Sequence, residues 1–160
     1  LAAVDTDELL QTASLEELAD GATIAVPSDA TNEGRALLLL ETQGLIKLAD
    51  STNLSSTPND IVENPKNLEF VEMEAAQIPS SLADVDLAVI NSNYALGAGL
   101  NPTEDALVLE SADSPYVNVL VVKEGNEESP AVLALIEALH SDTIRTYIEE
   151  TYGGAVIPAF

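Results

Sequence analysis

An asparagine and an arginine one helical turn apart, Asn32 and Arg35, are the residues of this chain best suited to ligand chemistry. They lie in a polar stretch, 27–35, between the apolar runs 23–26 and 36–40. In an open α/β sheet, a strand followed by a polar loop and a helix start presents backbone N–H groups to an anion. A guanidinium and a carboxamide at this spacing can together hold the carboxylate of a small molecule.

Arg35 stands out because the chain has only 5 Lys and Arg residues against 28 Asp and Glu residues. On a helix, its neighbours three and four positions away carry no charge, whereas Arg145 has Asp142 and Glu149 at these spacings. Two roles for Arg35 are open from spacing alone. It either binds a ligand carboxylate or forms a tertiary salt bridge.

Other polar side chains border further predicted strands. Asn91 follows one apolar run and Asn118 enters another, with Tyr94 and Tyr116 beside them. Taken singly, the asparagines are equally suited to capping a strand end, and the tyrosines are more typical of rim or core packing. Such polar breaks gather along one edge of an open α/β sheet, where ligands bind. We therefore expect a shared ligand site there.

Little in the sequence indicates an enzyme, a cofactor or a metal. The sole histidine, His140, lies at a joint between two predicted helices, where a structural or surface role is expected. The chain has no cysteine, and the nucleophile-elbow, phosphate-loop and dinucleotide motifs are missing. Three acidic pairs lack calcium-loop spacing and are typical of a solvated face: Glu72/Glu74, Asp84/Asp86 and Glu149/Glu150.

The composition is that of a folded, strongly acidic protein. Hydrophobic residues make up 46% of the 160 residues, which is enough for a buried core. A net charge of −23 disfavours nucleic acid and anionic membrane surfaces as partners, because both would repel the chain. It also disfavours multiply charged anions as ligands, whereas a zwitterion is tolerated.

Strands alternating with helices predict an α/β fold with a mostly parallel sheet. A helical turn capped by Ser14 and a turn or short helix over 57–65 are also expected. The predicted strands span 23–26, 68–72, 86–90, 106–109 and 117–123, and the predicted helices span 33–43, 75–82, 130–139 and the segment from Ser141 to Gly153.

Three parts of the chain are expected. Residues 1–20 form an N-terminal lead-in that is short on strands, and residues 21–111 form one α/β lobe. Residues 112–160 supply one strand and two helices, which is too little for a second lobe. The strand at 117–123 therefore lacks sheet partners within the chain.

With these segments in view, the chain resembles the methionine-binding lipoproteins of ABC importers, the NlpA type of substrate-binding protein. The likeness runs from about residue 14 to the end and is carried by several long, ordered motifs. The matching stretches are GATIAVP at 21–27, TNEGRALLLL at 31–40, DIVENPKNL at 60–68, AVINSNYA at 88–95, DSPYVN at 113–118 and GGAVIPAF at 153–160.

The resemblance implies a fold of the type II periplasmic-binding-protein kind, in which methionine is held between two lobes. Arg35 would pair with the α-carboxylate, helped by Asn32, while Asn91 and Asn118 would bind the polar end of the ligand. Tyr94 and Tyr116 are counted with this ligand set. The partner implied is an ABC importer permease, and the location is extracytoplasmic, with a lipid anchor in the full-length family.

The chain departs from the family at its N-terminal side. Family members carry a longer N-terminal part with the lipidated cysteine and the first βαβ unit of lobe one, so this chain is expected to hold lobe two complete and lobe one incomplete. An alternative follows from this departure. The chain would then be a shortened, non-binding relative that acts as an interaction module and pairs the strand at 117–123 with another chain or with itself.

Overall fold

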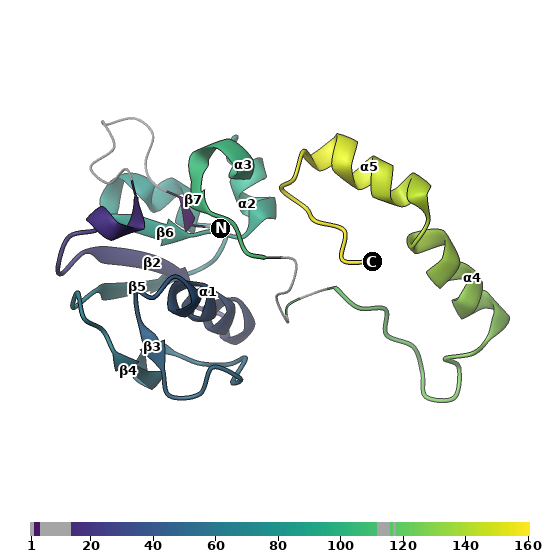
Figure 1. The fold of residues 1–160 in the computed structure, drawn as a ribbon, viewed down its shortest axis with the longest axis horizontal. Helices are drawn as coiled ribbons and strands as arrows, with labels where there is room; N and C mark the ends of the chain where they lie inside the picture. The colour runs from purple at the N-terminus through teal and green to yellow at the C-terminus, as the bar shows by residue number, and fades with distance from the viewer. Residues whose placement is uncertain (1, 4–13, 112–115, 117) are drawn as a thin grey trace. The chain divides into compact units, whose positions relative to one another are not determined.

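A computed structural model of the chain describes residues 2–3, 14–111, 116 and 118–160 and divides it into two compact units (Figure 1). The first unit spans Leu1–Glu110 and the second spans Ser111–Phe160. The first unit contains a sheet with helices on both faces, and it carries Asn32, Arg35 and Asn91. The second unit contains two helices.

The first unit follows the predicted alternation of strands and helices. Its main elements are β2 (Thr23–Pro27), α1 (Ala30–Thr42), β5 (Glu69–Met73), η3 (Ile78–Asp84), β6 (Leu87–Val89), α2 (Ser92–Gly97) and β7 (Ala106–Val108). Shorter elements complete it: β1 (Ala2–Ala3), η1 (Leu15–Glu17), β3 (Lys47–Leu48), η2 (Pro58–Asp60), β4 (Ile61–Glu63) and α3 (Pro102–Asp105).

The main sheet has the strand order β5-β2-β6-β1-β7. Strand β2 pairs in parallel with both β5 and β6, while β1 pairs antiparallel with β6 and with β7. Because β6 and β7 both oppose β1, four of the five strands run in one direction. The prediction of a mostly parallel α/β sheet is therefore confirmed. Strands β3 and β4 form a separate antiparallel pair.

Alternating side chains of β2 serve two different cores. Ile24 and Val26 pack with the buried leucines of α1 on one face of the sheet. Ala25 points to the other face, where it joins Ile78 of η3 and Ala95 of α2. This period of two is the expected outcome for a central strand that is covered on both sides.

Several local predictions need correction. Helix α1 begins at Ala30 rather than at residue 33, because Asp29 caps it directly after the strand. Residues 75–82 form no α-helix, since Pro79 lies within the 3₁₀ segment η3. Ser14 precedes the expected helical turn, η1, but its side chain makes no capping hydrogen bond.

The N-terminal segment also contributes a strand to the main sheet, which the sequence did not indicate. Ala2 and Ala3 form a strand between β6 and β7, although residues 1–20 were expected to be short on strands. Two alanines carry no strand signal of their own, so only the neighbouring strand edges select this pairing. The segment 57–65 likewise contains a strand, β4, after the expected short helix η2.

Two helices in the second unit were predicted accurately. Helix α4 (Pro130–Leu139) follows the cap Ser129, and α5 (Asp142–Tyr152) follows the cap Ser141. Each serine side chain accepts a hydrogen bond from the backbone N–H three residues on, as an N-cap does. Gly153 ends α5 in the left-handed region, at φ 52°.

The strand predicted at 117–123 is wrong over the residues that the structure describes there, 118–123, which pair with no strand. Val119 and Val121 are 74% and 82% exposed. Alternating β-branched residues favour a β-strand, but a strand also needs the edge of a neighbouring strand to complete its backbone hydrogen bonds. Residue 117 lies outside the described residues.

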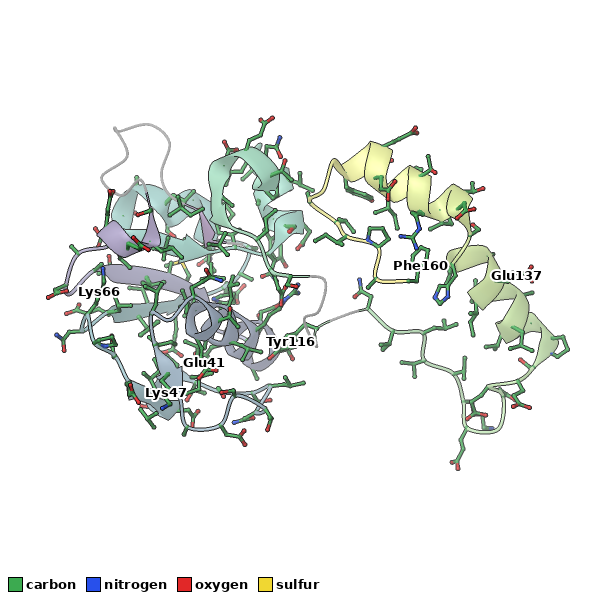
Figure 2. The ribbon with its side chains drawn as sticks, in the orientation of Figure 1. Glu41, Lys47, Lys66, Tyr116, Glu137 and Phe160 are labelled. Carbon is green, nitrogen blue, oxygen red and sulfur yellow. The ribbon has the colours of Figure 1, made fainter. Side chains whose placement is uncertain are left out.

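The C-terminal residue organises the second unit. The ring of Phe160 (labelled in Figure 2) stacks on His140 with centroids 4.8 Å apart and an interplanar angle of 6°. The guanidinium of Arg145 lies 4.8 Å from the centre of the same ring and donates to the backbone carbonyl of Phe160. His140 thus takes a packing role here.

No helix within the described part of the chain is both long enough and apolar enough to cross a membrane.

Replacing Gly34 tests how tightly α1 packs against the loop that follows β3. A Cβ atom at Gly34 would lie 2.5 Å from the backbone oxygen of Leu54, so Gly34→Ala is expected to lower the free energy of unfolding by about 1–3 kcal/mol. Gly97→Ala in α2 is the matched control, because no atom lies within 4 Å of its added methyl group. Urea unfolding in high salt measures both, and equal stabilities of the two variants would contradict the packing described.

Candidate ligand site at the carboxyl edge of the sheet

The candidate site starts where β2 meets α1. Ser28 donates its N–H to the carbonyl of Met73 at 2.8 Å, which holds the loop beside β5. Asp29 then adopts an extended conformation and caps α1, its side chain accepting the backbone N–H of Asn32 at 3.1 Å. The tight connection leaves Asn32 in the first turn of the helix, at the carboxyl edge of the sheet.

Two asparagines that are 59 residues apart in sequence meet at this edge. The Nδ2 group of Asn91 donates to Oδ1 of Asn32 at 2.8 Å. Asn91 directly follows Ile90, the last apolar residue of the β6 segment, and occupies the N-cap position of α2 without a side-chain capping bond. Its side chain turns toward Asn32 instead, so the parallel strands bring together two of the predicted site residues.

The carbonyl oxygen of Asn91 is one of two buried side-chain oxygens without a hydrogen-bond partner among the described residues, the other being Oε1 of Glu33. Oδ1 of Asn91 is shielded from solvent and has no hydrogen-bond partner among the described residues. A buried acceptor without a donor costs about 1–3 kcal/mol relative to a paired one. An orphaned buried group of this kind in a loop at a sheet edge points to a missing donor.

Arg35 has a tertiary acidic partner. Its Nε donates to Oε2 of Glu110 at 2.6 Å, and a second guanidinium N–H donates to the same oxygen. The arginine side chain is 38% exposed and the glutamate 20% exposed. The salt bridge left open by the sequence is therefore present, and Arg35 lies three residues after Asn32 on the same side of α1.

Glu110 and Glu33 were missed by sequence reasoning. Glu110 follows β7 and carries no motif, since its partner is 75 residues away. Glu33 lies where the polar stretch 27–35 overlaps the predicted helix 33–43 and was given no role, yet it is 4% exposed. The signal that could have revealed it is its position one residue before the small Gly34, which brings the backbone of Leu54 close to α1.

The carboxyl group of Glu33 lies in an acidic environment. Burial is the main cause that raises the pKa of Glu33 to about 7, and a hydrogen bond to Glu72 with repulsion from it adds to this. Repulsion from Asp29 and Asp60 raises the pKa further. Glu33 therefore carries a proton for part of the time at neutral pH.

Three predicted site residues remain: Tyr94, Tyr116 and Asn118. Tyr94 is exposed on α2 and lines a shallow depression with Pro79 and Ser80 of η3. Tyr116 and Asn118 belong to the second unit, in which Asn118 is exposed. Their part in a ligand site stays a prediction.

Among the described residues, no group of three or more His, Asp or Glu side chains is arranged to hold a metal ion.

Comparison with known proteins places this geometry in a family. The sequence profile of the NlpA lipoproteins matches residues 10–160. The chain belongs to the NlpA lipoprotein family. The likeness that the sequence analysis drew from six motifs is thereby confirmed.

Curated members of the NlpA family show the extent of the likeness. The D-methionine-binding lipoprotein MetQ of Salmonella typhi is 48% identical over 146 residues, and that of Escherichia coli K12 is 47% identical over 146 residues. Each alignment covers 90% of this chain and 54% of the relative. The chain thus spans about half the length of the curated relatives it matches.

Solved structures agree with the sequence comparison. A nutrient binding protein from Burkholderia cenocepacia bound to methionine is 44% identical, with a TM-score of 0.84 over 99% of this chain and 65% of that one. An ABC transporter periplasmic substrate-binding protein from Coxiella burnetii is 46% identical, with a TM-score of 0.82 over 98% and 64%. The α/β fold of a periplasmic substrate-binding protein, expected for the chain, is confirmed.

The same relatives support two broader expectations. They are binding proteins rather than enzymes, which agrees with the non-enzymatic reading of the sequence. Their description as lipoproteins and as a periplasmic protein confirms the expected extracytoplasmic location.

The raised pKa of Glu33 predicts a specific dependence of stability on pH. Because the pKa rises from 4.5 to about 7 on folding, the folded state binds the proton more tightly, and the stability present below pH 4.5 is lost as pH rises through 7. Glu33→Gln removes this ionisation and can donate to Glu72. At pH 8 the free energy of unfolding of the variant is expected to be higher than that of the native chain by on the order of 2 kcal/mol.

Urea unfolding in high salt at pH 4.5, 6, 7 and 8 measures the difference. Glu69→Gln is the matched control, because it removes one charge from an exposed side chain of β5. It is expected to leave the fall in stability between pH 4.5 and 7 in place. Parallel curves for Glu33→Gln and the native chain would show that Glu33 does not titrate in this way.

Proposed function

We propose that this chain is the methionine-binding part of a substrate-binding protein that delivers its ligand to an ABC importer permease. Relatives spanning nearly the whole chain are named as methionine-binding lipoproteins, and a structural neighbour is described as bound to methionine. The observation that carries the proposal is the cluster of a guanidinium and two amides at one sheet edge, from Arg35, Asn32 and Asn91.

These groups suit a zwitterion. The guanidinium of Arg35 offers donors to the α-carboxylate, and each charge-assisted hydrogen bond contributes about 1.5–3 kcal/mol. A ligand with no net charge adds nothing to the net charge of −23 that the chain already carries. Glu110 holds the guanidinium through one carboxylate oxygen, which orients it before the ligand arrives.

The division into lobes belongs to the same proposal. Residues 21–111 would form lobe two, residues 112–160 would belong to an incomplete lobe one, and residues 1–20 would lead in. Asn32 would assist Arg35 at the carboxylate, and Asn91 and Asn118 would bind the polar end of methionine. Tyr94 and Tyr116 would complete the set of ligand-binding residues.

A second function is favoured by the exposed segment 118–123. Val119 and Val121 are exposed and alternate in a segment that pairs with no strand among the described residues. An unpaired segment of this kind can pair with a strand of another chain. The chain would then be a non-binding module that associates with itself. Light scattering in high salt separates the two functions, because this one requires a dimer that Val121→Asp dissociates. A monomer that binds methionine excludes it.

Replacing Arg35 tests the methionine-binding function. Arg35→Ala is expected to abolish the rise in melting temperature that L- or D-methionine gives the native chain, and to weaken binding at least about 10-fold, because the carboxylate loses charge-assisted bonds. Thermal unfolding and calorimetry in high salt measure both effects. The melting temperature without ligand reports separately on the lost salt bridge with Glu110.

Lys47→Ala is the matched control, since it also removes one positive charge, from an exposed pair with Glu63. It is expected to keep full protection by methionine. Undiminished protection in Arg35→Ala would overturn the proposed role of Arg35. A native chain that is folded yet gives no heat with either enantiomer would overturn the function for this chain.

A further inference from the structure

The orientation of the two amides at the sheet edge is determined by a neighbouring carboxylate. Nδ2 of Asn32 lies 3.0 Å from Oδ1 and 3.0 Å from Oδ2 of Asp29. A carboxylate only accepts hydrogen bonds, so the amide nitrogen of Asn32, and not its oxygen, must face it. The position of Asp29 therefore leaves Asn32 a single amide orientation.

The same constraint passes on to Asn91. With its nitrogen toward Asp29, Asn32 turns Oδ1 the other way, where only a donor can be placed beside it. Nδ2 of Asn91 is that donor, at 2.8 Å. Oδ1 of Asn91 is consequently the atom left over, buried and without a partner among the described residues.

We propose that Asp29 is a positioning residue that, through Asn32, presents the carbonyl oxygen of Asn91 as an acceptor for the ammonium group of the ligand. This inference rests on the proposed function, in which the ligand is an amino acid. A carboxylate at the start of the relay thus selects a hydrogen-bond donor at its end, and the ammonium group of an amino acid is such a donor. An asparagine in place of Asp29 would allow both amides to turn over and to offer N–H instead.

The inference assigns different roles to Asn32 and Arg35. The nitrogen of Asn32 is directed at Asp29 and its oxygen is occupied by Asn91, so Asn32 assists Arg35 indirectly, by transmitting orientation. Direct contact with the α-carboxylate then falls to Arg35. Helix α1 would then bind the carboxylate of the zwitterion through Arg35, and the loop after β6 would bind its ammonium group through Asn91. Asp29 is itself held in place as the cap of α1.

Asp29→Asn tests the relay with little change in shape. The new asparagine still caps a helix well, so α1 is expected to remain folded. Calorimetry in high salt compares methionine with 4-(methylsulfanyl)butanoate, the same molecule without its ammonium group. The native chain is expected to prefer methionine at least about 100-fold. In Asp29→Asn this preference falls about 10-fold or more, while affinity for the butanoate changes little.

Asp50→Asn is the matched control, because Asp50 is an exposed aspartate that also accepts a backbone N–H, that of Thr52 two residues further on. It is expected to keep the native preference. If the preference of Asp29→Asn for methionine equals that of the native chain, the positioning role of Asp29 is overturned, even though methionine binding and the proposed function stand.

Side-chain amide NMR gives a second readout that needs no ligand. The Nδ2 protons of Asn32 and Asn91 are expected to be hydrogen-bonded and slowly exchanging in the native chain and in Asp50→Asn. In Asp29→Asn the turned amides would let Nδ2 of Asn32 donate to Oδ1 of Asn91, so the Nδ2 protons of Asn91 are the ones expected to lose this protection. Unchanged protection in Asp29→Asn refutes the relay. If the native chain binds no methionine, the proposed function fails and this measurement alone decides the orientation imposed by Asp29.

Discussion

Strand β2 lies between two parallel neighbours, and its register with them decides which side chains meet at the carboxyl edge of the sheet. Ile24 is paired with Phe70 of β5 and with Leu87 of β6. Because the three strands run in parallel, their carboxyl ends all lie at the same edge of the sheet. The loop carrying Asp29 therefore emerges beside the loop carrying Asn91, and a hydrogen bond over 59 residues becomes possible.

The acidic composition shapes this edge as strongly as the topology does. A chain with 5 basic residues against 28 acidic ones can neutralise few carboxylates directly. It places Glu33 in the core where the group holds a proton more tightly, and it uses Arg35 to pair Glu110. Asp29 is used twice, as a helix cap and as the acceptor that orients Asn32. The placement of these few charged side chains, and not the number of basic residues, therefore determines the electrostatics of the site.

Local sequence patterns predicted the elements around the site well, because each carries its own signal. The β-branched run before Pro27 marked a strand, and the caps Ser129 and Ser141 marked two helices. Patterns failed where an element needs a partner. Residues 118–123 have the alternation of a strand without the neighbouring edge, whereas Ala2 and Ala3 have the edges without the alternation. Hydrogen bonding between strands decides both cases.

The sequence by itself determined the family, the α/β alternation and the choice of Asn32, Arg35 and Asn91 as residues of interest, because periodicity, capping and motif order are local properties. Only the tertiary structure decided what these side chains do to one another. The partner of Arg35, the burial of Glu33 and the unpaired oxygen of Asn91 arise from contacts between distant segments. Such contacts depend on strand register and helix packing, which leave no trace in the spacing of neighbouring residues.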